Sequence, residues 1–122
     1  MNILSIFKHE HSGMSEKEIY EAYKIFFGTL VSSSRLKIIN LLRKGRKNVS
    51  EIIKETEMNQ TAVSHDLARL KRCGFVFSEI NGKYRYYNLN KKTIKPLMEL
   101  IDKHMVEFCI HILRNKKKDE RR

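Results

Sequence analysis

Residues 59–70 have the sequence NQTAVSHDLARL, in which apolar and polar residues recur with the period of a helix. Val63, Leu67 and Leu70 recur at intervals of four and three residues, which places them on one face of a helix. Asn59 is of a residue type that caps helices by accepting a backbone N–H. The stretch therefore predicts a short amphipathic helix with a polar opposite face.

The sequence upstream of this stretch predicts three more helices. Asn48 followed by Glu51 marks the start of a short helix, which ends at the connection 57–59. Two helices joined by so short a connection form a helix-turn-helix. Further upstream, helical spacing of apolar residues predicts a helix over residues 15–31, and another begins at the serines 32–34.

Downstream of residue 74, the spacing of apolar residues changes from a helical period to the alternation typical of strands. Residues 75–80 and 83–89 are rich in strand-forming residues, and Asn81-Gly82 between them favours a tight hairpin turn. A long last helix is expected from Asn90, with a heptad-like apolar seam. The seam consists of Ile94, Met98, Ile101, Met105, Phe108 and Ile112. We expect a mainly α fold with a small β-hairpin, a winged helix-turn-helix whose flanking helices form a dimer interface.

The length of the chain sets its domain organisation. With 122 residues it is too short for two ordinary domains. We expect residues 1–14 to form an N-terminal arm and residues 15–113 to form the winged helix-turn-helix, with dimerisation helices at both ends. Residues 114–122 form a basic tail that we expect to be frayed.

Charge and composition narrow the class of partner. The chain carries 25 Lys and Arg against 14 Asp and Glu, a net charge of +11, which favours nucleic acid over an anionic membrane surface. No apolar run is long enough to span a membrane, and no secretory signal is visible. Two cysteines make no disulfide framework, so we expect a cytoplasmic protein without a membrane partner. The sequence contains no phosphate-binding glycine-rich loop and no nucleophile motif, so we do not expect an enzyme.

The polar face of the 59–70 helix is suited to double-stranded DNA. With the apolar residues inward, short or planar hydrogen-bonding side chains face outward, while Asp66 is expected to point sideways. Basic residues follow at the helix end and in the hairpin, where they suit phosphate groups. The expected DNA-binding residues are Asn59, Gln60, Thr61, Ser64, His65, Arg69, Lys71, Lys83 and Arg85. The alternatives are an ordinary solvated helix face and a charged hairpin edge that prevents aggregation.

Three stretches, in order and at matching spacing, resemble the ArsR/SmtB family of winged-helix repressors. Residues 30–39 are similar to the start of its second helix, residues 59–70 to its recognition helix and residues 74–89 to its wing. The resemblance covers roughly residues 25–113, and Ser33 departs from it because the family usually has proline there. It implies a homodimeric repressor of an inverted-repeat operator. The alternative is a non-specific DNA- or RNA-binding or chromatin-architectural winged-helix protein.

The resemblance also implies metal-sensing sites, which this sequence keeps only in part. The family's Cys-x-Cys pair falls on Asn48 and Ser50, which are poor ligands for soft metals. A second family site begins with Asp-x-His, matched by Asp102 and His104, but its completing positions are Asn115 and Lys118.

We therefore expect no cofactor and no metal ligands. The alternative is a zinc site formed across two subunits by Asp102, His104 and His111, with His9 or His11 assisting. A thiol switch at Cys73 or Cys109 is a further alternative, although neither matches the family's usual sulfur-sensing position.

Overall fold

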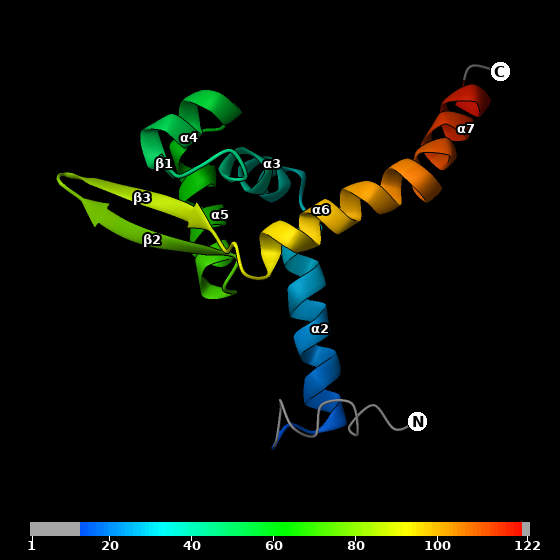
Figure 1. Ribbon diagram of the computed structural model, residues 1–122, viewed down its shortest axis with the longest axis horizontal. Coiled ribbons are helices and arrows are strands. Elements are labelled where there is room, and N and C mark those ends of the chain that lie inside the picture. The colour runs from blue at the N-terminus through cyan, green and yellow to red at the C-terminus, as the bar shows by residue number, and fades with distance from the viewer. Residues whose placement is uncertain (1–12, 121–122) are drawn as a thin grey trace.

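The computed structural model describes residues 13–120, with side chains for residues 13–116, and is mainly helical (Figure 1). Most of the expected N-terminal arm, with His9 and His11, and the side chain of Lys118 lie outside these ranges. The elements follow in the order α2 (Glu16–Leu30), α3 (Ser33–Leu42), β1 (Lys47–Asn48), α4 (Val49–Thr56), α5 (Gln60–Arg72), β2 (Val76–Asn81), β3 (Tyr84–Leu89), α6 (Ile94–His104), the π-helical turn η1 (Met105–Cys109) and α7 (Ile110–Glu120).

Side-chain caps start the helices where the sequence predicts them. Ser15 and Asn48 each form a reciprocal capping box at the starts of α2 and α4. Ser32 caps α3 by accepting the Arg35 backbone N–H. Ser33 thus takes the first position of α3, where the helix forms without the family's usual proline.

The sheet has one more strand than expected, because the sequence predicts only a two-stranded ribbon. Its order is β1-β3-β2, all antiparallel, with Lys47 opposite Tyr87 in the added pair. A two-residue strand is too short to show alternation, so the sequence pattern misses it. The hairpin itself forms as predicted, and Gly82 at its tip has φ of 66°, which glycine adopts without strain.

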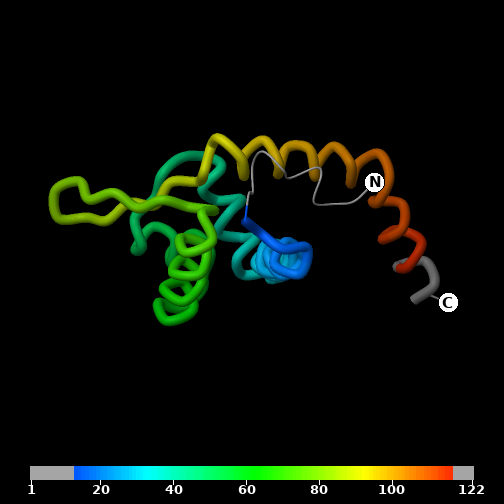
Figure 2. The backbone as a smooth tube through the Cα atoms, turned by 90° about the horizontal axis from the view of Figure 1, so that it is seen from below, coloured from blue at the N-terminus to red at the C-terminus, as the bar shows by residue number. Residues whose placement is uncertain are grey.

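One hydrophobic core joins α3, α4, α5, the hairpin and the start of α6. Its buried side chains are Ile38, Ile39, Leu42, Ile52, Val63, Leu67, Leu70, Phe75, Val76, Leu89, Ile94 and Met98. Figures 1 and 2 show α2 and the α6–α7 helix extending away from this core, while the hairpin projects from the opposite side. The extended helices therefore leave much of their surface outside the core.

The last helix differs from the single seam that the sequence predicts. A turn follows Asn90, so α6 begins only at Ile94, and the π-helical turn η1 interrupts the α-helical register. Ile94 and Met98 are buried, but the later seam residues Met105, Phe108 and Ile112 are exposed. The described backbone of the basic tail is helical to residue 120, and the expected fraying after residue 113 stays a prediction.

Among the described helices, none alone is long and apolar enough to cross a membrane. Helices α2 and α3 meet that requirement only as a pair, and the pair is bent by 79°.

Candidate nucleic-acid interface

Helix α5 has its polar residues on the outside, as the sequence predicts. Val63, Leu67 and Leu70 are at most 2% exposed and hold the helix to the core. The exposed polar side chains at its N-cap and in its first half are Asn59, Gln60, Thr61, Ser64 and His65, which together we call the reading face. These side chains offer donors and acceptors without a bulky apolar group, so they can approach the base edges of a major groove.

Asn59 has a structural task at the start of α5. Its Oδ1 accepts the backbone N–H of Ala62 at 2.8 Å, which satisfies one of the unpaired donors at the helix start. Asn59 therefore orients the first turn of the reading face. Its expected contact with DNA stays a prediction.

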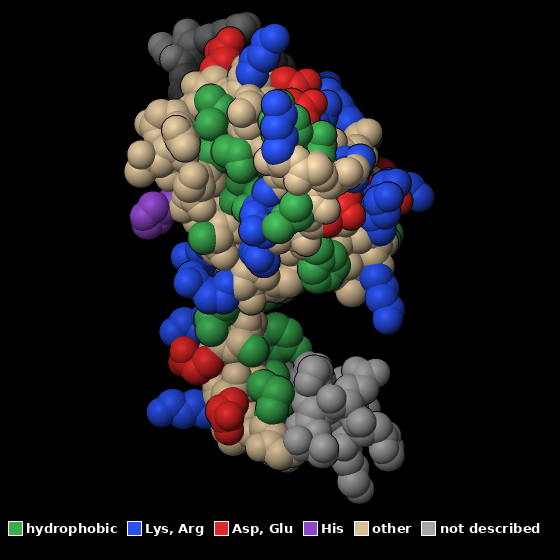
Figure 3. All heavy atoms as spheres, turned by 90° about the vertical axis from the view of Figure 1, so that its left-hand side faces the viewer, with side chains coloured by type: hydrophobic (Ala, Val, Ile, Leu, Met, Phe, Trp, Pro, Cys, Tyr) green, Lys and Arg blue, Asp and Glu red, His purple; other side chains and the backbone are tan. Residues whose placement is uncertain are grey.

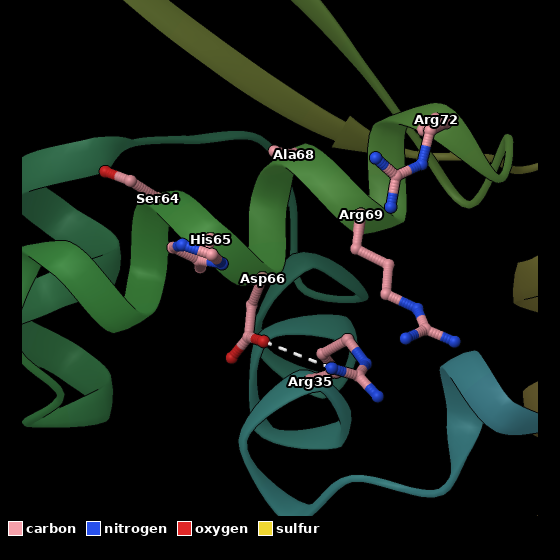
Figure 4. A pocket seen from close by; sticks show the side chains of 7 residues that line it. All are labelled: Arg35, Ser64, His65, Asp66, Ala68, Arg69 and Arg72. Carbon is pink, nitrogen blue, oxygen red and sulfur yellow. Dashed lines mark hydrogen bonds and ion pairs between the residues drawn. The ribbon is translucent and has the colours of Figure 1, made fainter.

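Two of the basic residues near the end of α5 differ in their surroundings. Lys71 is exposed, whereas Arg69 is half-buried and its Nε donates to Thr29 Oγ1 at 3.2 Å. Arg69 and Arg72 line a groove of about 470 Å³ beside the reading face, together with Arg35, Ser64, His65, Asp66 and Ala68 (Figure 4). The groove is predominantly cationic.

We expect Asp66 to point sideways, whereas the structure directs its carboxylate inward, towards α3. Asp66 is 8% exposed, and its carboxylate accepts from Arg35 at 3.3 Å (Figure 4). The other carboxylate oxygen accepts from Ser34 Oγ at 2.6 Å. Helical spacing alone places Asp66 at the border between the apolar and polar faces. The partners that draw it inward lie more than 30 residues away on α3, so a local pattern cannot reveal them.

The hairpin presents its predicted basic residues at the surface. Lys83 and Arg85 are both exposed, and Arg85 Nη1 donates to Ser78 Oγ at 3.3 Å across the two strands. Lys83 Nζ lies 5.3 Å from the centroid of the Tyr84 ring. Of the neighbouring tyrosines, Tyr87 packs against the core, as expected for a strand aromatic.

A group of polar contacts fixes the hairpin to the segment before β1, and no local sequence pattern predicts it. Arg46 Nη1 pairs with Glu79 at 2.7 Å, and the Arg46 guanidinium lies 4.4 Å from the centroid of the Tyr86 ring. Asn88 donates to the same Glu79 oxygen at 3.2 Å. The hydrogen bonds from Arg46 and Asn88 lower the pKa of Glu79 below its ordinary value of 4.5.

Figure 3 shows the molecule from the hairpin side. Lys and Arg side chains are spread over this face, and Asp and Glu side chains form smaller groups between them. The lower part of the view, which is α2, also carries exposed hydrophobic side chains. The face that carries the hairpin is therefore compatible with a polyanion.

The residues considered for zinc do not form a site within one subunit. Asp102 Oδ2 pairs with Arg43 Nη2 at 2.7 Å, and the ring of His104 lies beside Phe108, with centroids 5.1 Å apart. Among the described residues, no three His, Cys, Asp or Glu side chains could hold one metal ion. Within the described part of one subunit these side chains are therefore not arranged as a metal site, and a site shared between two subunits stays the alternative prediction.

The two cysteines are free and half-buried. Cys73 Sγ lies 3.4 Å from Thr29 Oγ1, so its surroundings include a polar contact from α2. Cys109 belongs to the π-helical turn.

Comparison with known proteins agrees with this geometry. The sequence profile of the bacterial regulatory protein arsR family matches residues 32–78, from the N-cap of α3 into β2. An uncharacterised HTH-type transcriptional regulator of Methanocaldococcus jannaschii is 31% identical over 86 residues, which cover 70% of this chain and 97% of that protein. The chain belongs to the ArsR family. It is thus a transcriptional regulator with a winged helix-turn-helix fold, and this family does not consist of enzymes.

Other relatives include both a transcriptional activator and a repressor. The transcriptional activator HlyU of Vibrio cholerae is 27% identical over 63% of this chain and 71% of its own length. The arsenical resistance operon repressor of Bacillus subtilis is 26% identical over 69% of this chain and 81% of its own length. A homodimeric winged helix-turn-helix DNA-binding domain from Mycobacterium bovis superimposes with a TM-score of 0.71 at 27% identity, covering 83% of this chain and 95% of that one.

Proposed function

We propose that this regulator binds an inverted-repeat operator as a homodimer and represses transcription from it. The observation that carries the proposal is the reading face of α5, which is exposed and polar while its opposite face is buried in the core. A two-fold dimer would place two such helices in successive major grooves, about one helical turn apart. Repression agrees with the relative from Bacillus subtilis, and HlyU makes activation the alternative outcome.

The DNA-binding residues divide into two roles. Gln60, Thr61, Ser64 and His65 suit base edges, because they lie in the first half of the helix and carry planar or hydroxyl hydrogen-bonding groups. Asn59 holds the first turn beside them. Phosphate oxygens suit the cationic side chains that flank the reading face. These are Lys71 at the helix end, Arg69 in the groove, and Lys83 and Arg85 in the wing.

The dimer is proposed to form through α2 and the α6–α7 helix. The exposed large hydrophobic side chains of the described residues lie mainly on these elements, namely Tyr20, Tyr23, Ile25 and Phe27 on α2, Val31 just after it, and Leu100, Met105, Val106, Phe108, Ile110, Ile112 and Leu113. So much apolar surface on two extended helices indicates an interaction surface. The homodimeric neighbour from Mycobacterium bovis supports a second copy as the partner.

The proposal does not include zinc. The Asp102 carboxylate is already paired with Arg43, and the positions that would complete the family's site are Asn115 and Lys118. A sensed ligand is therefore not assigned to this surface.

Binding to the promoter region beside its own gene, compared with random duplex, tests the proposal. Gln60→Ala should weaken specific binding by about 1–3 kcal/mol, because one base contact is lost. Lys83→Ala should weaken binding to all sequences and lower the salt slope by about 1, because one phosphate contact is lost. Lys17→Ala, at the start of α2, removes the same charge away from the reading face and serves as the control.

Two results would contradict the proposal. Equal affinity of the wild type for its promoter and for random duplex would mean that it binds nucleic acid without sequence specificity. Unchanged promoter affinity of the Gln60→Ala protein would mean that another face reads the DNA. A reporter gene under the same promoter distinguishes repression from activation, and we expect its expression to fall when the protein is present.

A further inference from the structure

One arginine joins three helices at the back of the reading face. Arg35, in the first turn of α3, donates from Nε to the Thr29 carbonyl at 2.7 Å and from Nη2 to the Gly28 carbonyl at 3.1 Å. Its Nη1 donates to Asp66 Oδ1 on α5 at 3.3 Å. We call these four residues, Gly28, Thr29, Arg35 and Asp66, the Arg35 clamp.

The clamp satisfies groups that the helices leave unpaired. The last carbonyls of a helix have no partner within it, and Arg35 supplies donors to two of those at the end of α2. The second oxygen of Asp66 accepts from Ser34 Oγ at 2.6 Å. The side chains of Arg35 and Asp66 are 15% and 12% exposed, so solvent screens their interaction only weakly.

A second contact runs parallel to the clamp. Arg69 Nε, one helical turn beyond Asp66, donates to Thr29 Oγ1 at 3.2 Å. Thr29 is fully buried, and its hydroxyl donates to the Ile25 carbonyl at 2.7 Å. The end of α2 is thus tied to α5 at two successive turns, which opposes rotation of α5 about its own axis.

The clamp lies next to the reading face. Asp66 directly follows Ser64 and His65 in the sequence, and all three line the same groove (Figure 4). Because side chains on one helix move together, a rotation of α5 that releases Asp66 also changes the direction of Gln60 and Ser64. The apolar side of α5 restrains such a rotation less specifically than charged hydrogen bonds of fixed geometry do.

We propose that Arg35 and Asp66 are positioning residues for sequence-specific DNA binding, which set the rotation of α5 relative to α2. The inference rests on the proposed function in that α5 is taken to read bases. Neither residue needs to touch DNA for this role. The clamp also links the reading helix to α2, one of the two helices proposed for the dimer.

The direction of the change in DNA affinity distinguishes a positioning role of Asp66 from a purely electrostatic one. Asp66→Asn removes a negative charge near the DNA-binding surface at nearly constant shape. If Asp66 were only a nearby charge, its loss would strengthen binding to every duplex, because phosphate repulsion is reduced. If Asp66 positions α5, binding to the operator weakens while binding to random duplex does not.

The experiment compares Asp66→Asn and Arg35→Lys with the wild type on operator and random duplex, at a temperature where all are folded. Arg35→Lys keeps the charge but loses the planar set of donors that reaches three acceptors. For each variant we expect operator affinity to fall about tenfold, the equivalent of about 1.4 kcal/mol, with no fall on random duplex. Asp102→Asn breaks the pair with Arg43 at the same change of net charge and is the matched control, whose operator-to-random ratio should not change.

Amide hydrogen exchange of the DNA-free proteins separates this inference from the proposed function. Both clamp variants should exchange faster in α5 and in the last turn of α2. If the wild type shows no preference for any duplex, the proposed function fails and the exchange data still decide whether the clamp restrains α5. Wild-type exchange in both variants, or an unchanged operator-to-random ratio where the wild type is specific, would overturn the inference.

Discussion

Substitutions at Asn59, the N-cap of α5, can distinguish the effect of the capping hydrogen bond on stability from the effect of charge on DNA binding. Asn59 Oδ1 accepts the Ala62 N–H at 2.8 Å, and Asn59→Ala removes this acceptor. The site is exposed, so water replaces the lost partner in part, and we expect a loss of about 1 kcal/mol in the free energy of unfolding. For a domain of this size that corresponds to a fall in melting temperature of about 4 °C.

Two further substitutions at the same position sharpen the prediction. Asn59→Asp keeps the cap, so stability should stay near that of the wild type, but its negative charge faces DNA and should weaken binding to every duplex. Asn59→Ser keeps the cap without a charge and should preserve stability. The change in operator affinity with Asn59→Ser then reports whether the amide itself contacts a base.

Chemical denaturation followed by circular dichroism measures the stabilities. All proteins are compared at one protomer concentration, because unfolding of a dimer depends on concentration. If Asn59→Ala is as stable as the wild type, the cap does not stabilise α5. If Asn59→Asp is destabilised as much as Asn59→Ala, the capping hydrogen bond is not the source of the effect.

Four other predictions follow from single contacts. Ile52 is fully buried, so Ile52→Ala should lower the free energy of unfolding by roughly 2–5 kcal/mol in chemical denaturation, through lost burial and a new cavity. Phe27→Glu places a charge on an exposed apolar face of α2 and should shift sedimentation towards monomer, whereas a wild-type profile would exclude Phe27 from the dimer surface. Because the pKa of Glu79 is lowered in the folded protein, its pair with Arg46 stabilises the fold fully above pH 4.5, and this contribution is lost as pH falls through the lowered pKa. Glu79→Gln should therefore be destabilising at neutral pH but not in strong acid. Chemical denaturation at both pH values measures the difference. Added zinc should leave operator affinity unchanged in a titration, because Asp102 is paired with Arg43; tight zinc binding with altered affinity would restore a metal site.

The sequence predicts those parts of the structure that depend on short-range chemistry. Caps at Ser15, Asn48 and Asn59 mark three helix starts, and the spacing of Val63, Leu67 and Leu70 identifies the exposed face of α5. The turn at Asn81-Gly82 follows from the backbone freedom of two adjacent residues. Such features are decided within a few residues, so a local pattern contains them.

Long-range contacts account for what the sequence pattern misses. Asp66 is placed inward by Ser34 and Arg35, and the hairpin is fixed to the segment before β1 by Arg46 and Glu79, which are 33 residues apart. Strand β1 exists only because β3 lies beside it. These partners become neighbours only when the chain is folded.

The sequence by itself determined a basic winged helix-turn-helix and the face of α5 that is available to DNA. The tertiary structure decided how that face is held, because the Arg35 clamp unites α2, α3 and α5 through charged hydrogen bonds. It also decided that the apolar seam of the last helix does not continue unbroken, since η1 changes the helical register after His104. The physical reason is the range of the forces involved: caps, turns and periodicity act over a few residues, whereas ion pairs and strand pairing require segments that only folding brings together.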